Sequence, residues 1–337
     1  MSNAATSQPD PGLILQTLCA FEQTQALKAA IELDIFTAIA DGATTPAPIA
    51  EQVKASERGV RILCDYLTVH GFLTKADGVY GLSPTAATFL NKHSPVYMGG
   101  MASFLAHETI VGAYNNLADT VRRGGAKPGA STVDPDNPIW VEFARAMSGF
   151  LGAVAGMVAG IVAKPGEPQK VLDIAAGHGM FGLQIAKANP AAEIYALDWK
   201  SVLAVAQENA DRMGLAARFH QIPGSAFDVP LGEGYDLVLI PNFLHHFDHA
   251  TNVAFLKRVR AALKASGTVV TSEFVPNPDR VSPPIPATFS LQMLGGTPAG
   301  DAFTFAELDA MFREAGFGES KPQALPPTPQ TLILTRI

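Results

Sequence analysis

The sequence predicts an α/β protein in which a mainly helical N-terminal half precedes a parallel-rich sheet covered by helices. In the second half, short apolar runs alternate with helical segments, which is typical of a parallel sheet with helices on its faces. The apolar runs are residues 171–174, 194–197, 236–240 and 268–272. The helical segments are residues 181–188, 201–213 and 252–263. In the first half, three helical stretches precede a short hairpin. A chain of 337 residues also exceeds one comfortable hydrophobic core, so we expect two domains.

The N-terminal elements follow from spacing and from turn residues. Apolar residues recur at helical spacing over residues 13–39, and a second helix begins at residues 44–45, with threonine at its cap and Pro46 in its first turn. A third helix covers residues 58–70. Asp77 and Gly78 then separate two strand-like runs, which is the pattern of a β-hairpin. Three helices followed by a hairpin form a winged-helix arrangement.

Winged-helix domains often bind DNA, and a ligand-sensing regulator is therefore one functional hypothesis. The candidate recognition helix, residues 57–70, holds Arg58 and Arg61 but also Asp65, and is otherwise largely apolar. The chain has a net charge of −7 and a pI near 5.6, with its lysines and arginines scattered. We therefore expect no nucleic-acid partner and favour a protein–protein role for this domain.

A glycine- and proline-rich stretch, residues 124–138, is predicted to be a loop between helices. Residues 146–163 after it contain no charge, and Gly152, Gly156 and Gly160 repeat the small-residue spacing also found in membrane helices. The segment is rich in alanine and glycine rather than leucine, and a strand–turn–helix pattern follows it at once. A buried, closely packed helix is therefore favoured over a membrane span, and no membrane partner is expected.

The termini and cysteines favour a cytoplasmic protein. Residues 1–11 are polar and lack the basic-then-apolar order of a signal peptide, so we expect a mobile tail. Cys19 and Cys64 are far apart and form no C-x-x-C pair, which indicates neither a disulfide framework nor a cysteine zinc site.

The strongest motif is the glycine turn after the first apolar run. Gly177, Gly179 and Gly182 have G-x-G-x-x-G spacing between a strand pattern and a helix pattern, which predicts a nucleotide-like cofactor. Asp198, at the end of the next run, would accept the ribose hydroxyls of either a dinucleotide or S-adenosylmethionine. Asp173 distinguishes between these two cofactors, because a carboxylate at the mouth of the turn repels a pyrophosphate but attracts an ammonium group. The residues favour S-adenosylmethionine over NAD.

These residues, taken in order, resemble a known family. The motifs are V-L-D-I-A-A-G-H-G at 171–179, A-L-D at 196–198, G-S-A-F at 224–227, L-H-H-F at 244–247 and A-G-F at 315–317. With the N-terminal winged-helix pattern, they are similar to the dimeric class I S-adenosylmethionine-dependent O-methyltransferases of the caffeic acid and acetylserotonin type. The resemblance covers almost the whole chain from residue 13. It implies a Rossmann-like methyltransferase domain and an intertwined homodimer.

The resemblance also implies a cofactor bed at the carboxyl ends of the strands. Its members are Asp173, Gly177, Gly179, Asp198, Ser225, Ala226, Phe227 and Asn242. Trp199 either lies against the adenine or covers the sheet edge. The family often has an acid where Ser225 stands, and a lysine where Pro241 stands.

The resemblance places His245 as the general base that deprotonates an acceptor hydroxyl. Glu273, at the end of the last strand pattern, matches the first of two acids that bracket this histidine in the family. Ala302 falls at the second position, which leaves Asp301 as the substitute. Because this arrangement is altered, a non-methylating relative that decarboxylates, hydroxylates or catalyses a pericyclic reaction is a second hypothesis.

An apolar acceptor pocket is expected between the two halves. Its candidate walls are Phe143, Met147 and Phe150 on one side, and Phe289, Met293 and Leu294 on the other. They predict a flat, largely apolar, hydroxylated small molecule as the acceptor. The cluster His245, His246, Asp248 and His249 lacks a fourth ligand and a second shell, so we expect no metal. Asp248 is expected to cap the next helix, and His246 and His249 to be solvated or structural.

These observations lead to a domain plan and a functional hypothesis. We expect a tail at residues 1–11, a winged-helix-like dimerisation domain at 12–105, a helical linker contributing to pocket and dimer at 106–167, and a cofactor-binding catalytic domain at 168–337. The favoured function is S-adenosylmethionine-dependent O-methylation of an aromatic or polyketide-like small molecule in secondary metabolism.

Overall fold

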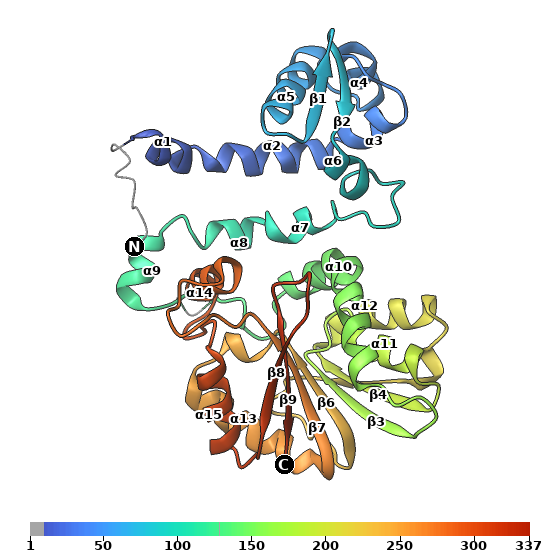
Figure 1. The fold of residues 1–337 in the computed structure, drawn as a ribbon, viewed down its shortest axis with the longest axis vertical. Coiled ribbons are helices and arrows are strands. Elements are labelled where there is room, and N and C mark those ends of the chain that lie inside the picture. The colour runs from blue at the N-terminus through green and yellow to red at the C-terminus, as the bar shows by residue number, and fades with distance from the viewer. Residues whose placement is uncertain (1–9, 128) are drawn as a thin grey trace, which may run out of the picture. The chain divides into compact units, whose positions relative to one another are not determined.

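The computed structural model describes residues 10–127 and 129–337, in two units divided after Ala106 (Figure 1). Most of the predicted tail lies outside the described residues. The first unit contains α1 (Gly12–Leu18), α2 (Ala20–Glu32), α3 (Ile35–Ala40), α4 (Pro46–Gln52), α5 (Glu57–Val69), β1 (Leu73–Ala76), β2 (Val79–Leu82), α6 (Pro84–Phe89) and α7 (Met101–Leu105).

The predicted helices and hairpin of the first unit are present, with one correction. The apolar run at residues 13–39 is divided among three helices: α1 and α2 are separated at Cys19, and Asp34, with a left-handed φ of 58°, separates α2 from α3. Pro46 opens α4, and Asp77 and Gly78, both at positive φ, form the turn between antiparallel β1 and β2. On α5, Asp65 accepts hydrogen bonds from Lys75 at 2.5 Å and from the Tyr80 hydroxyl at 2.7 Å. These bonds join the hairpin to the helix.

The described part of the second unit holds a seven-stranded sheet of order β5-β4-β3-β6-β7-β9-β8. The parallel strands are β3 (Gln169–Ile174), β4 (Ala192–Asp198), β5 (Phe219–Pro223), β6 (Tyr235–Pro241) and β7 (Leu263–Glu273). β8 (Ser320–Ala324) and β9 (Thr331–Arg336) extend it antiparallel. The sequence patterns predicted β3, β4, β6 and β7 but missed the other three strands.

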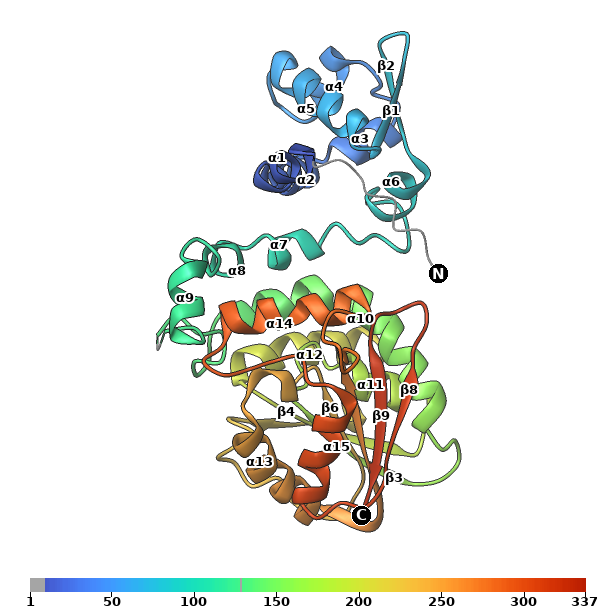
Figure 2. The same ribbon diagram turned by 60° about the vertical axis from the view of Figure 1, so that its left-hand side comes forward.

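Helices cover both faces of this sheet (Figures 1 and 2). α10 (Ile139–Val162), α11 (Met180–Ala188) and α12 (Lys200–Arg212) lie on one side, and α13 (His249–Ala262) and α15 (Phe305–Glu314) on the other. α14 (Pro284–Gly296) lies at the end of the sheet where the parallel strands stop. Two short helices, α8 (Glu108–Gly112) and α9 (Leu117–Arg123), and two 3-10 turns, η1 (Ala216–Arg218) and η2 (Leu244–His246), complete the unit.

α10 contains the uncharged segment singled out in the sequence. Among the described helices it alone is long and apolar enough to cross a membrane, and 33% of its most apolar window is buried. It packs against α11 and α12. Close packing holds at Gly152, where a Cβ would lie 2.9 Å from Met180 Cε, whereas a Cβ at Gly156 or Gly160 would meet open space. The expectation of a closely packed glycine face is therefore right at one of three positions.

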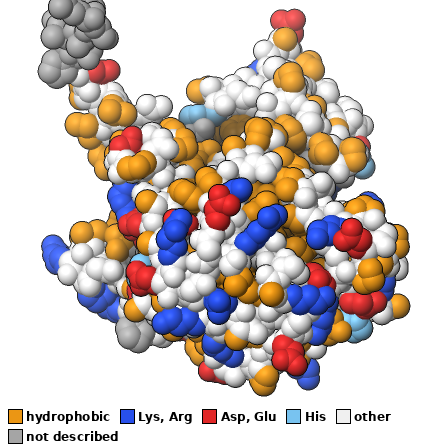
Figure 3. All heavy atoms as spheres, turned by 60° about the horizontal axis from the view of Figure 1, so that its bottom comes forward, with side chains coloured by type: hydrophobic (Ala, Val, Ile, Leu, Met, Phe, Trp, Pro, Cys, Tyr) orange, Lys and Arg blue, Asp and Glu red, His pale blue; other side chains and the backbone are white. Residues whose placement is uncertain are grey.

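The surface charges are mixed. On the face seen in Figure 3, lysine and arginine side chains lie interspersed with aspartate and glutamate. Interspersed charges give no extended positive field of the kind that holds a nucleic-acid backbone.

Candidate active site

The glycine turn has the geometry that its spacing predicts. β3 ends at Ile174, and Ala175, Gly177 and Gly179 take positive φ values of 50°, 58° and 72° before α11 begins. At Gly182, a Cβ would lie 2.5 Å from Ile194 Cγ2, so glycine allows α11 to approach β4. The turn therefore presents backbone, rather than side chains, to a ligand at the end of β3.

Asp173 is fully buried at the end of β3. Its Oδ2 accepts a hydrogen bond of 2.9 Å from the Gly182 amide, whereas its Oδ1 is shielded from solvent and has no partner among the described residues. Burial raises the pKa of this carboxyl from 3.8 to about 8. An orphaned carboxylate oxygen beside the glycine turn fits a ligand that brings an ammonium group, as S-adenosylmethionine does.

We expect Asp173 to make the stability of the cofactor-free protein depend on pH. Because its pKa is raised on folding, its contribution is complete below about pH 4 and is lost as the pH rises towards 8. The loss is about 1.4 kcal/mol for each pH unit in which only the unfolded state is ionised. Urea unfolding of wild type and Asp173→Asn from pH 5 to 8 should show a steeper decline for wild type. Parallel curves would contradict the assignment.

Asp198 joins the turn to the end of β4. Its Oδ2 accepts from the Gly177 amide at 2.8 Å and its Oδ1 from the Trp199 amide at 2.7 Å. Burial raises the pKa of this carboxyl to about 6. The Trp199 side chain packs, as Trp140 and Val141 do, against a small apolar cluster of Ala144, Val202 and Val205 between α10 and α12.

The turn after β5 lies beside Asp198. Gly224 has φ 138° and donates its amide to the Asp198 carbonyl at 2.9 Å, and the Ser225 hydroxyl accepts from the Phe227 amide at 3.1 Å. The Phe227 ring packs among other aromatic rings of the core, at 4.8 Å from Phe247. Ser225, Ala226 and Phe227 can thus offer backbone groups to a ligand, while the phenyl ring supports the turn.

Arg258 of α13 anchors this turn, and no sequence motif indicated it. Its Nη1 donates to the Ala226 carbonyl and its Nη2 to the Val229 carbonyl, both at 2.7 Å. Two charge-assisted bonds from one planar group fix the turn more firmly than a single ammonium can.

We therefore expect Arg258→Lys to weaken cofactor binding about tenfold while kcat at saturating cofactor changes little. The measurement is the affinity for S-adenosylhomocysteine by calorimetry, together with the cofactor KM. Arg260→Lys is the matched control, because Arg260 lies on the same helix and donates to the Gly316 carbonyl at 2.7 Å. Equal losses in both variants, or a fall in kcat alone, would contradict this role.

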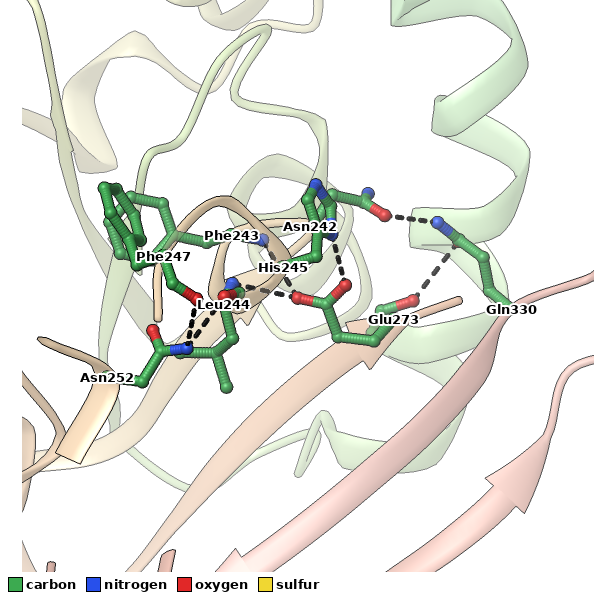
Figure 4. Close-up of polar contacts among 9 residues, drawn as sticks. Asn242, Phe243, Leu244, His245, Phe247, Asn252, Glu273 and Gln330 are labelled. Atoms are coloured by element: carbon green, nitrogen blue, oxygen red, sulfur yellow. Dashed lines mark hydrogen bonds and ion pairs between the residues drawn. The ribbon is translucent and has the colours of Figure 1, made fainter. Parts of the chain in front are cut away.

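His245 and Glu273 form a buried pair at the ends of adjacent strands (Figure 4). His245 Nδ1 lies 2.5 Å from Glu273 Oε2. The other oxygen, Oε1, accepts from the amides of Phe243 at 3.1 Å and Leu244 at 2.9 Å. The carboxylate therefore holds both the imidazole and the backbone that carries it, which leaves Nε2 as the nitrogen that can accept a proton.

Two amide side chains support the same loop (Figure 4). Asn252 of α13 is fully buried, and its Nδ2 donates to the carbonyls of Leu244 at 2.8 Å and Phe247 at 3.2 Å. Gln330, just before β9, donates its Nε2 to Asn242 Oδ1 at 2.5 Å. Asn242, expected at the cofactor, thus has its side-chain oxygen engaged by the C-terminal hairpin.

Asp301, expected as the second acid, has a different charge partner in the structure. Its amide donates to the His245 carbonyl at 2.9 Å, but its carboxylate forms an ion pair with Arg280 Nη1 at 3.1 Å. Arg280 also contacts Glu307 at 2.5 Å, so the guanidinium draws Asp301 into a surface network. Ala302 is fully buried. Among the described residues, Glu273 is the one acid hydrogen-bonded to the His245 ring.

Two of the expected wall residues lie beside His245 and the glycine turn. The Phe289 ring on α14 lies 4.9 Å from the His245 ring at 81°, and Phe143 on α10 stacks on His178 of the glycine turn at 6.0 Å. Met293 is buried on α14. Met147, also buried, and Phe150, half-buried, follow Phe143 by one and two turns of α10. All of these residues belong to the second unit.

The remaining members of the histidine cluster have separate partners or neighbours. Asp248 caps α13 by accepting from the Thr251 amide at 2.7 Å, which confirms its expected role. His249 pairs with Glu314 at 3.0 Å on the surface. His246 is half-buried against Trp140. No group of three or more metal-ligating side chains occurs in the described part of the chain.

Comparison with known proteins places this geometry in a family. Residues 15–92 match the model of the O-methyltransferase dimerisation domain, and residues 135–318 match the O-methyltransferase domain. The chain is 29% identical to 3-hydroxy-5-methyl-1-naphthoate 3-O-methyltransferase of Streptomyces sahachiroi, covering 92% of this chain and 90% of the relative. It is also 29% identical to mouse acetylserotonin O-methyltransferase, covering 94% and 86%.

Comparison with solved structures gives the same family. A candidate O-methyltransferase from Nostoc punctiforme has a TM-score of 0.94 at 46% identity, covering 98% of this chain and 99% of that one. Human N-acetylserotonin methyltransferase, solved with S-adenosylmethionine, shares the fold with a TM-score of 0.83 at 21% identity, covering 99% of each chain. The chain therefore belongs to the O-methyltransferase family that joins a dimerisation domain to an S-adenosylmethionine-dependent methyltransferase domain.

Proposed function

We propose that the protein methylates a hydroxyl of an aromatic or polyketide-like small molecule in secondary metabolism, with His245 as general base. The buried His245–Glu273 pair is the observation that supports this most directly. It stands at the ends of β6 and β7, and β6 neighbours β3, which leads into the glycine turn. The naphthoate O-methyltransferase among the relatives acts on a hydroxylated aromatic acid, which supports the same acceptor class here.

The residues of this chain divide the reaction between binding and proton transfer. S-adenosylmethionine supplies a methyl group on a positively charged sulfur, which an acceptor oxygen attacks as the carbon–sulfur bond breaks. Asp173 would hold the ammonium of this cofactor and Asp198 its ribose hydroxyls, and backbone groups of Gly177 and Gly179 would contact it. His245 Nε2 takes the hydroxyl proton, while Glu273 orients the ring and stabilises the imidazolium that forms. The rest of the rate enhancement comes from alignment of the acceptor oxygen with the methyl group.

The test is methyl transfer from labelled S-adenosylmethionine to a panel of hydroxynaphthalenes and hydroxyanthraquinones, followed as O-methyl product and S-adenosylhomocysteine. An O-methylated product supports the proposal. Failure to bind S-adenosylhomocysteine at micromolar protein would contradict the cofactor assignment of the individual residues.

A second candidate rests on the position of Asp301. Because its carboxylate pairs with Arg280, Glu273 is the one acid among the described residues that holds His245, and an altered base arrangement of this kind is the ground for a non-methylating reaction. A product that has lost carboxylate or gained oxygen, with S-adenosylmethionine unconsumed, would favour this candidate over O-methylation.

We also propose a homodimer in the cytoplasm. Residues 15–92 match a dimerisation domain, and α1 and α2 expose a run of large apolar side chains. These are Leu13, Ile14, Leu15, Leu18 and Phe21, each at least 62% exposed. An apolar surface of this kind suits a second copy of the chain. Leu15→Asp together with Leu18→Asp should shift the species seen by light scattering from dimer to monomer, and an unchanged mass would contradict this surface.

A further inference from the structure

His246 is a polar ring without a polar partner. Its Nδ1 is shielded from solvent, and no described residue hydrogen-bonds to either ring nitrogen. The ring lies 4.3 Å from the His245 ring at 69°, and 5.3 Å from the Trp140 ring at 69°. His246, which the sequence analysis expects to be solvated or structural, is thus half-buried beside His245.

His246 belongs to a continuous arc of rings that connects the glycine turn to the catalytic pair. From the turn, the successive rings are His178, Phe143, Trp140, His246, His245, Phe289 and Phe274, with neighbouring centroids between 4.2 and 6.0 Å apart. The arc draws on α10, the loop after β6, α14 and the end of β7. Because one end is the cofactor turn and the base lies within it, the arc lies where an acceptor must lie.

Each of the other polar rings in the arc has one nitrogen held by a hydrogen bond to the protein. Trp140 Nε1 donates to the Thr132 carbonyl at 2.7 Å, and His245 Nδ1 is held by Glu273. His178 Nδ1 accepts from the Met180 amide at 3.1 Å. His246 differs from them, because among the described residues neither of its ring nitrogens has a hydrogen-bond partner.

Burial, and then the proximity of His245, lowers the pKa of His246 well below 6.5, so the ring is neutral at pH 7. A neutral imidazole offers one N–H donor and one lone pair. It can donate to a carbonyl or ether oxygen, or accept from a hydroxyl. Leaving these groups unpaired in a half-buried site costs stability that a phenylalanine would not cost. The histidine is explained if a ligand supplies the partner.

We propose that His246 is a specificity residue that hydrogen-bonds a second oxygen of the acceptor, next to the hydroxyl deprotonated by His245. This inference rests on the proposed function. Because the two imidazoles are consecutive and their centroids lie 4.3 Å apart, one rigid planar molecule meets both with oxygens on the same edge. The acceptor class is therefore a planar aromatic with two neighbouring oxygens, in ortho or peri positions.

The test compares acceptors that differ by one oxygen. The probes are 1-naphthol against 1,8-dihydroxynaphthalene, and 2-naphthol against 2,3-dihydroxynaphthalene, each titrated in the presence of S-adenosylhomocysteine and assayed with S-adenosylmethionine. Wild type should favour at least one dioxygenated partner by tenfold or more, in affinity and in kcat/KM. His246→Phe should abolish this ratio, His246→Gln should keep part of it, and affinity for S-adenosylhomocysteine should not change in either.

His249→Phe is the matched control, because His249 is exposed and pairs with Glu314 away from the arc. A wild-type protein without preference, binding of none of the four probes, or equal losses for both members of a pair in His246→Phe would each overturn the inference. Binding is measured separately from turnover, so a tenfold preference that His246→Phe abolishes supports the inference even where no methyl is transferred. That pattern would count against the proposed function alone.

Discussion

Replacing His245 with alanine should lower the rate of methyl transfer by about 10²- to 10⁴-fold while leaving affinity for S-adenosylhomocysteine unchanged. The range is that of general-base assistance, since an acceptor hydroxyl must lose its proton as its oxygen attacks the methyl group. The imidazole has its Nδ1 held by Glu273 at 2.5 Å and contributes no contact to the glycine turn or to Asp198. Single-turnover methyl transfer and calorimetry measure the two quantities.

Glu273 provides the accompanying control. Because its Oε1 also accepts from the Phe243 and Leu244 amides, Glu273→Ala would disturb the loop as well as the ring, so Glu273→Gln is the informative variant. Glu273→Gln should lower kcat less than His245→Ala, and the double variant should be no slower than His245→Ala, because the two side chains act as one unit. Additive losses would show that Glu273 acts independently, and a near wild-type rate for His245→Ala would remove the histidine from the mechanism.

The sequence could predict the parts of the site that depend on local pattern. The glycine turn, Asp173 and Asp198 follow directly from strand ends and positive-φ positions, which short-range spacing specifies. The parallel strands β3, β4, β6 and β7 were visible as buried apolar runs. β5, β8 and β9 were missed because β5 and β8 have mostly exposed, polar side chains, as edge strands do, and β9 gains its burial by pairing with distant β7.

The parts that sequence could not supply depend on contacts between distant segments. Asn252 and Arg258 lie on one helix, yet their partners are carbonyls of the catalytic loop and of the turn after β5, which carry no side-chain signature. Asp301 shows how a distant charge affects a residue that the sequence did single out. Its position in the chain suggested a second acid, but Arg280, 21 residues away, determines where its carboxylate lies. The ion pair between Asp301 and Arg280 forms only on folding, so the order of residues in the sequence does not reveal it.

Gly300→Ala should have a large effect on activity although residue 300 lies outside the catalytic pair. An added Cβ would lie 2.3 Å from the His245 carbonyl oxygen, 2.6 Å from Thr297 Oγ1 and 3.0 Å from the His246 carbonyl carbon. Two of these atoms are backbone, so Gly300→Ala must displace the loop that positions the base. Overpacking of this kind costs about 1–3 kcal/mol of folding stability. A displacement near 1 Å at the reacting groups costs on the order of 100-fold in rate.

Gly300→Ala should therefore lose about 100-fold in kcat while it remains folded and binds S-adenosylhomocysteine normally, since the glycine turn and Asp198 lie on other strands. Gly296→Ala is the control, because its Cβ would meet Thr132 at an ordinary 3.5 Å. It should retain wild-type activity. Full activity in Gly300→Ala would mean that the contact between residue 300 and the His245 carbonyl does not set the position of the base. A shift confined to the loop after β6 leaves β3 and β4 in place. An equal loss of cofactor affinity would therefore mean that the substitution also displaces the ends of β3 and β4.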